Sequence, residues 1–137
     1  MARILVVDDE QSIRDLLDTI LRRRGHEVLL ADHGQKALEL FQRERPHVVI
    51  LDLHMPGMNG IAALKQFRTI DAQTPVIILT GVGTEAMEQQ ARTLGVTDFL
   101  QKGFSLHALG SALDRALKQA TPATSSSPSV APSTAKR

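Results

Sequence analysis

Short apolar runs alternate along this chain with stretches in which apolar residues recur every three or four positions. The run Ile4–Val7 is followed by apolar residues at 13, 16, 17 and 20, which is the spacing of one face of an α-helix. Apolar runs of this length suit buried strands, so the alternation predicts five βα units. The predicted strands are 4–7, 28–30, 48–51, 76–79 and 99–100, and the predicted helices are 13–24, 36–43, 61–67, 85–94 and 106–117.

The predicted strands are apolar on both sides, which indicates a parallel sheet covered by helices on both faces. Right-handed crossovers leave few ways to wind five such units. We therefore expect an α/β fold with a single doubly wound five-stranded parallel sheet of order 2-1-3-4-5, the flavodoxin-like (αβ)5 arrangement. A fragment of a larger dinucleotide-binding fold is the alternative.

The composition of the chain changes at Thr121. From there the sequence reads TPATSSSPSVAPSTAKR, in which 14 of 17 residues are Pro, Ala, Ser or Thr. Such a segment has too little apolar surface to offset the entropy lost on ordering. We predict one domain over residues 1–120 and a disordered Ser/Pro/Ala/Thr-rich tail or linker over residues 121–137.

Polar side chains follow the predicted strands at the edge where parallel sheets bind ligands. Asp8 and Asp9 follow the first strand, Asp52 the third, Thr80 the fourth, and Lys102 the fifth after one Gln. Two carboxylates about 5 Å apart repel by roughly 3 kcal/mol at an effective dielectric of about 20. A cluster of three therefore needs a cation, and Mg²⁺ is the usual ion where a phosphate shares the site.

The remaining two residues of this set complete a chemical pattern. Lys102 supplies a fixed positive charge and Thr80 supplies one hydroxyl donor. A carboxylate nucleophile, a metal ion, an ammonium and a hydroxyl together resemble a site of phosphoryl transfer.

The segments VVDDE, LDLHMPGMNG, VIILTG and DFLQKGF, in this order and spacing, resemble a response-regulator receiver domain of two-component signalling. The resemblance covers residues 1 to about 119. It implies that Asp52 accepts a phosphoryl group from a phospho-histidine on a sensor histidine kinase or a histidine phosphotransfer protein. It also implies that Asp9, Asp52 and the backbone carbonyl of His54 bind Mg²⁺, with Asp8 acting mainly through a metal-bound water.

The same resemblance assigns the remaining roles. Lys102 would pair with the phosphoryl oxygens and Asp52, and Thr80 would bond to the phosphoryl group. Phe99 would change rotamer as Thr80 moves, although a plain core role suits Phe99 as well. The surface of the fourth predicted helix, the fifth strand and the fifth helix would then change and regulate a downstream protein or a missing output domain. The protein would be a signalling switch in a phosphorelay and not an enzyme with an external substrate.

Two positions bear on how such a site would work. The family usually has a Pro after the Lys, joined by a cis bond, but here Lys102 precedes Gly103. A cis bond costs about 3–4 kcal/mol before a residue other than Pro, against about 0.5–1 before Pro. Our hypothesis is weaker preorganisation of Lys102 and a more mobile final loop.

His54, two residues after Asp52, is hypothesised to tune the lifetime of the phosphorylated state.

Composition excludes several other classes. There is no Cys, so disulfides and thiolate metal sites are absent. The N-terminus turns acidic after four apolar residues and no run is long enough to span a membrane, so we expect a cytoplasmic protein with no membrane contact. Of 16 basic and 15 acidic residues, Lys136 and Arg137 lie in the tail, leaving 14 basic and 15 acidic over residues 1–120. That balance gives no support for direct nucleic-acid binding.

Several competing interpretations remain. Asp8, Asp9 and Glu10 also suit capping of the helix that follows them. The segment GVGTEA at 81–86 fits a dinucleotide fingerprint, but too little chain follows for a second mononucleotide-binding half. Phosphohydrolases of the haloacid-dehalogenase type need a second acid two residues after the nucleophile, where this chain has His54. A degenerate receiver used only for binding is disfavoured by the full set of site residues.

Overall fold

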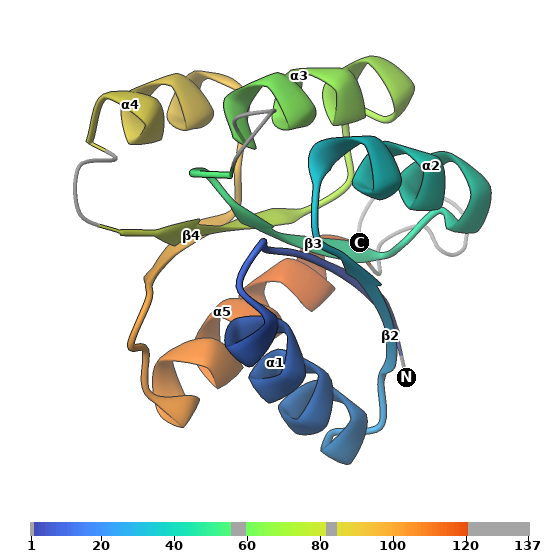
Figure 1. Ribbon diagram of the computed structural model, residues 1–137, viewed down its shortest axis with the longest axis vertical. Helices are drawn as coiled ribbons and strands as arrows, with labels where there is room; N and C mark the ends of the chain where they lie inside the picture. The colour runs from blue at the N-terminus through green and yellow to red at the C-terminus, as the bar shows by residue number, and fades with distance from the viewer. Residues whose placement is uncertain (1, 56–59, 82–84, 121–137) are drawn as a thin grey trace, which may run out of the picture.

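The computed structural model describes residues 2–55, 60–81 and 85–120, and strands and helices alternate along them (Figure 1). All ten predicted elements are present, with ends that differ from the predictions by a few residues. The strands are β1 (Arg3–Val7), β2 (Glu27–Ala31), β3 (Val48–Asp52), β4 (Val76–Thr80) and β5 (Asp98–Gln101). The helices are α1 (Gln11–Arg23), α2 (Gly34–Glu44), α3 (Gly60–Ile70), α4 (Glu85–Thr93) and α5 (Leu106–Ala120).

The five strands form one parallel sheet of order β2-β1-β3-β4-β5. This order confirms the flavodoxin-like prediction. It differs from the 3-2-1-4-5-6 order of dinucleotide-binding folds, which removes that alternative. The chain order reverses between β1 and β3, so the switch point lies where we expected it.

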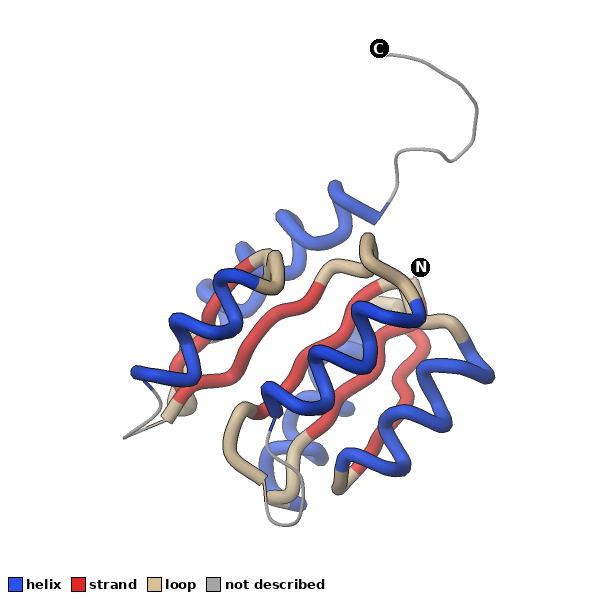
Figure 2. The backbone as a smooth tube through the Cα atoms, turned by 90° about the horizontal axis from the view of Figure 1, so that it is seen from above, coloured by secondary structure: helices blue, strands red, loops and turns tan. Residues whose placement is uncertain are grey.

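Helices cover the sheet on both faces, in three layers (Figures 1 and 2). Alternate residues of each strand face opposite layers, as the two-residue period of a strand requires. Leu5 and Val7 of β1 belong to the core under α2, α3 and α4, whereas Ile4 and Val6 belong to the core under α1 and α5. The sheet is therefore buried on both sides, which explains why its strands are apolar throughout.

The register of the sheet brings the strand ends to one edge. Val7 of β1 is paired with Leu51 of β3, so the next residues, Asp8 and Asp52, follow a matched pair. Because β4 and β5 reach the same edge, Thr80 and Lys102 can approach from the other side of the switch point.

Arg68 joins three segments at the opposite end of α3 from the switch point. Its guanidinium donates to the carbonyls of Thr74 at 2.8 Å, Leu94 at 2.8 Å and Gly95 at 3.1 Å, and to that of Asp71 at 3.5 Å. The side chain thus ties the end of α3 to the loop before β4 and to the end of α4. Nothing in the sequence pattern predicted this arrangement.

Among the helices that the structure describes, none is both long and apolar enough to cross a membrane.

Candidate functional site

Asp52 ends β3 and is buried. Its Oδ1 accepts the backbone N–H of His54 at 3.0 Å, and its Oδ2 accepts the ammonium of Lys102 at 3.1 Å. Burial raises the pKa of Asp52, and these two donors oppose the rise. The two hydrogen bonds also fix the carboxylate in one orientation at the edge of the sheet.

Asp8 follows β1 and has no exposed surface. Its Oδ1 accepts the backbone N–H of Glu10 at 2.8 Å. Its Oδ2 is buried and has no hydrogen-bond partner among the described residues, although Lys102 Nζ lies 3.4 Å away. Burial raises the pKa of Asp8 to about 6, and the nearby charge of Asp52 adds to the rise. Among the described residues, the ion-pair partner of this buried oxygen is an ammonium that it shares with two other carboxylates, so a further cation would stabilise it.

Lys102 lies in the loop after β5, where its backbone N–H donates to the carbonyl of Thr80 at 2.9 Å. Its Nζ lies within ion-pair distance of three carboxylates, at 2.5 Å from Glu10, 3.1 Å from Asp52 and 3.4 Å from Asp8. Burial acts to lower the pKa of Lys102, but these carboxylates outweigh it and raise the pKa. The ammonium therefore remains charged.

Gly103 does not turn Lys102 away from the acidic cluster. Gly103 has a φ of +91°, a region that Gly enters freely and Pro cannot adopt. With this backbone, Lys102 still reaches Asp52. The predicted mobility of the final loop stays a prediction.

Thr80 and Phe99 lie on adjacent strands beside this cluster. Thr80 is buried at the end of β4, and its hydroxyl donates to the carbonyl of Leu100 at 3.4 Å. Phe99 is half-buried on β5 and packs against the core under α2, α3 and α4. The guanidinium of Arg92 lies 4.4 Å from the centroid of its ring. The predicted movements of Thr80 and Phe99 would start from this arrangement.

The donor atoms of the acidic cluster suit a hard divalent cation. Asp8, Asp9 and Glu10 each offer one carboxylate oxygen, and these oxygens lie within 4.8 Å of one another. The Oδ2 atom of Asp8 is buried and accepts no hydrogen bond from a described residue, so the residues present fit Mg²⁺. Asp8 and Asp9 of this cluster also belong to the predicted set of metal ligands. That set further contains Asp52 and the backbone carbonyl of His54. The part played by Asp52 and His54 stays a prediction.

Glu10 is the residue that sequence reasoning undervalued. It is the N-cap residue of α1, but its side chain makes no capping hydrogen bond, so the capping interpretation is wrong for Glu10. Instead its carboxylate binds Lys102, which lies 92 positions later in the chain. The only available signal was that Glu10 directly follows Asp8 and Asp9.

Comparison with known proteins settles the family. The sequence model of the family described as response regulator receiver domain matches residues 4–114 of this chain. The chain belongs to the response regulator receiver domain family. Receiver domains act in two-component signal transduction and are typically signalling switches, not enzymes. The matched segment contains all the predicted site residues of this receiver domain.

Relatives of this receiver domain differ in length. Regulatory protein AtoC of Escherichia coli is 40% identical over 116 residues, which are 85% of this chain and 25% of that protein. Sporulation initiation phosphotransferase F of Bacillus subtilis is 36% identical over 115 residues, 84% of this chain and 93% of that protein. The crystal structure of a response regulator receiver domain protein from Clostridium thermocellum matches with a TM-score of 0.83 and 32% identity, covering 87% of this chain and 96% of that one.

The receiver domain thus spans about a quarter of AtoC but nearly all of the other two proteins. The structure describes α5 as far as Ala120. The predicted tail over residues 121–137 lies outside the described residues, as does part of the GVGTEA segment. The domain boundary at residue 120 stays a prediction.

Proposed function

We propose that this receiver domain is a phosphorylation-dependent switch, in which Asp52 accepts a phosphoryl group from a phospho-histidine donor in the presence of Mg²⁺. The observation that carries the proposal is the pairing of buried Asp52 with Lys102 beside the buried Oδ2 of Asp8, which accepts no hydrogen bond from a described residue. The carboxylate of Asp52, the ammonium of Lys102 and the acidic cluster lie together at the switch point of the sheet, which supports roles as nucleophile, fixed charge and cation site.

The chain's own residues supply positioning and charge for the transfer. An oxygen of Asp52 forms the new bond to phosphorus while the bond to the donor imidazole nitrogen breaks, and that nitrogen regains a proton from solvent. Lys102 is 3.1 Å from the Asp52 oxygen and can follow the phosphoryl oxygens that replace it. The two hydrogen bonds to Asp52 hold its carboxylate in place before the donor arrives.

The proposed ligands for the cation are Asp8, Asp9, Asp52 and the backbone carbonyl of His54. When bound, Mg²⁺ would neutralise charge that accumulates on the phosphoryl oxygens. Asp8 has no exposed surface, and its Oδ2, which accepts no hydrogen bond from a described residue, supports its inclusion in this set. His54 is exposed, which leaves its side chain free to influence water near Asp52 and hence the lifetime of the phosphorylated state.

Phosphorylation would be read on the surface of α4, β5 and α5. The hydroxyl of Thr80 now bonds to the carbonyl of Leu100 at 3.4 Å, a long hydrogen bond that a phosphoryl oxygen can replace. Phe99 follows one residue before Leu100 and would move as Thr80 moves. The result is a shift between two states of one surface, biased by contacts at Asp52.

The proposed phosphoryl donors are a sensor histidine kinase or a histidine phosphotransfer protein. The similarity to sporulation initiation phosphotransferase F supports a place in a phosphorelay. The output is a downstream protein or an output domain, and the much longer AtoC is consistent with the second. We expect this domain to act by protein contacts in the cytoplasm, with no direct binding of nucleic acid or membrane.

Intact mass spectrometry after incubation with phosphoramidate and Mg²⁺ tests the proposal. Phosphoramidate is a small donor with the phosphorus–nitrogen bond of phospho-histidine. We expect the wild type to gain one phosphoryl group and Asp52→Asn to gain none, while Asp32→Asn, which alters an exposed carboxylate after β2, behaves as the wild type. Equal labelling of Asp52→Asn would contradict the proposal. Steady release of phosphate from unrelated phosphoesters would favour the phosphohydrolase instead.

A further inference from the structure

The side chain of Glu10 binds the ammonium of the site and does not cap the helix that follows it. Its Oε1 lies 2.5 Å from Lys102 Nζ, a shorter separation than that of either Asp52 or Asp8. As the N-cap residue of α1, Glu10 makes no side-chain hydrogen bond to that helix. The side chain of Glu10 is therefore oriented by Lys102.

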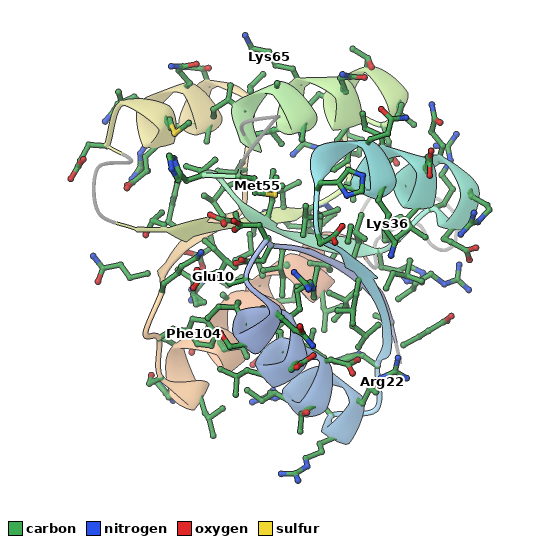
Figure 3. The ribbon with its side chains drawn as sticks, in the orientation of Figure 1. Glu10, Arg22, Lys36, Met55, Lys65 and Phe104 are labelled. Carbon is green, nitrogen blue, oxygen red and sulfur yellow. The ribbon has the colours of Figure 1, made fainter. Side chains whose placement is uncertain are left out.

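The same carboxylate borders the place where a cation fits. Oxygens of Asp8, Asp9 and Glu10 lie within 4.8 Å of one another. The backbone of Glu10 is fixed by its hydrogen bond to Asp8, but its side chain is 52% exposed. In the view of Figure 3, Glu10 lies between Met55, just after β3, and Phe104, just after Lys102. Because this side chain is half exposed and its carboxylate lies within 4.8 Å of oxygens of Asp8 and Asp9, rotation of the side chain alone can turn the carboxylate from the ammonium towards a cation.

A second observation points to a cation at this place. The Oδ2 atom of Asp8 is buried, and no described residue donates a hydrogen bond to it. Lys102 is the one ammonium paired with the cluster in the part of the chain that the structure describes, and it is shared among Asp8, Glu10 and Asp52. With Asp9 there are four carboxylates, and the guanidinium of Arg14 donates to the backbone carbonyl of Asp8 at 2.8 Å. Four carboxylates against one ammonium and one guanidinium leave the cluster with a net negative charge. A divalent cation would leave Lys102 with fewer competing partners.

We propose that Glu10 exchanges partners when Mg²⁺ binds: it leaves Lys102, joins Asp8 and Asp9 at the cation, and releases the ammonium to Asp52 and the incoming phosphoryl group. Only the last step rests on the proposed function. The exchange itself is a property of the unphosphorylated chain. Glu10 thereby becomes a positioning residue that links occupation of the metal site to the availability of Lys102.

Isothermal titration calorimetry of the full chain with Mg²⁺ tests the first half of the exchange. Glu10→Gln keeps the shape of the side chain and removes its charge, so we expect the Kd for Mg²⁺ to rise roughly fivefold to tenfold. The matched control is Asp15→Asn, which removes one exposed negative charge within α1. We expect that control to change the Kd less than about twofold.

NMR of the Lys102 side chain tests the second half. The ¹³Cε and ¹⁵Nζ resonances of Lys102 report on the groups that its ammonium contacts. We expect Mg²⁺ to shift these resonances in the wild type and in Asp15→Asn, and to shift them much less in Glu10→Gln, where no charged partner is exchanged. A Kd in Glu10→Gln within twofold of the wild type, or an equal Lys102 shift in both proteins, would overturn the proposal.

Labelling with phosphoramidate separates this proposal from the proposed function. If the wild type acquires no phosphoryl group while the two Kd values and the Lys102 shifts differ as stated, the proposed function fails and the exchange stands. If the wild type is labelled on Asp52 but the Kd values coincide, the exchange fails and the proposed function stands.

Discussion

The guanidinium of Arg92 lies over the face of the Phe99 ring, with its central carbon 4.4 Å from the ring centroid. Arg92 is in the last turn of α4 and Phe99 is in β5, so this contact joins the two elements whose surface we propose as the output. A cation over an aromatic face is worth about 0.5–1 kcal/mol at exposed sites. The contact therefore favours the present rotamer of Phe99 by an amount small enough for the proposed shift between states to overcome.

Replacement of Arg92 by Met keeps a long side chain but removes the cation. We expect Arg92→Met to lower the free energy of unfolding by about 0.5–1 kcal/mol and to increase exchange between rotamers of Phe99. Chemical denaturation measures the first effect, and relaxation dispersion of the Phe99 ring carbons measures the second. Arg43→Met is the matched control, because Arg43 also lies in the last turn of a helix, is exposed, and pairs with half-buried Glu44 instead of an aromatic ring. Similar ring dynamics in both variants would contradict the role given to Arg92.

Arg68 is expected to matter for stability and not for phosphorylation. Its guanidinium donates to four backbone carbonyls, and loss of the side chain leaves those in the interior without a donor. We expect Arg68→Ala to lower the free energy of unfolding by about 2–4 kcal/mol, measured by urea denaturation in the presence of Mg²⁺. Arg68→Lys should recover only a minor part, because an ammonium cannot match the planar fork. A loss below about 0.5 kcal/mol, the value for ordinary surface positions, would show that the carbonyls are served equally by water.

Gly103 gives a test of the loop that carries Lys102. At a φ of +91°, a Cβ meets no atom within 4 Å, so the cost of substitution there comes from the backbone and not from crowding. We expect Gly103→Ala to cost about 1–2 kcal/mol and Gly103→Asn less, because Asn tolerates positive φ better. Gly103→Pro requires a φ near −65°, so the loop must change and the labelling rate of Asp52 should change with it. Urea denaturation and the rate of labelling by phosphoramidate measure these effects. An unchanged stability in Gly103→Pro would contradict the backbone described here.

Sequence alone predicted the layout of the sheet because its signals are local. Each strand is a short apolar run and each helix has a regular apolar period, and the handedness of crossovers then leaves little choice of order. The strand ends followed from the same reasoning, so Asp52 and Lys102 could be expected to meet although 50 residues separate them. The place of a ligand beyond these strand ends stays a prediction.

The contacts that sequence could not predict depend on side-chain direction. Glu10 is one residue past the predicted acidic pair, and only the position of Lys102 shows that its carboxylate turns away from α1. The carbonyls bound by Arg68 become visible only when the ends of two helices are brought together. The pairing of Arg92 with Phe99 likewise depends on how α4 lies over β5. The periodicity of apolar residues does not indicate which side chains will meet when they are far apart in the sequence.

Asp8 predicts an opposite dependence on pH for the metal-free and the metal-bound domain. Its pKa is raised from 3.8 to about 6, mainly by burial, so the fold favours the neutral carboxyl. The stability that this group contributes is present below pH 3.8 and is lost as the pH rises through about 6. In EDTA we therefore expect Asp8→Asn to be more stable than the wild type at pH 7.5 by about 1–3 kcal/mol, and the difference to shrink towards pH 4.

Binding of Mg²⁺ reverses the sign, because a ligand carboxylate must be ionised. Between pH 8 and about 6 we expect the Kd of the wild type for Mg²⁺ to change little, and below pH 6 to rise by up to tenfold per pH unit. Calorimetric titrations at a series of pH values measure this dependence of the Kd, with Asp32→Asn as a control whose exposed carboxylate lies outside the cluster.

If protonation of His26 accounted for the pH dependence of the Kd instead, His26→Gln would remove that dependence. The pKa of His26 is lowered by burial, and its Nδ1 accepts the N–H of Ala2 at 3.2 Å. A Kd that stays constant down to pH 5 would show that Asp8 does not bind the cation as a carboxylate.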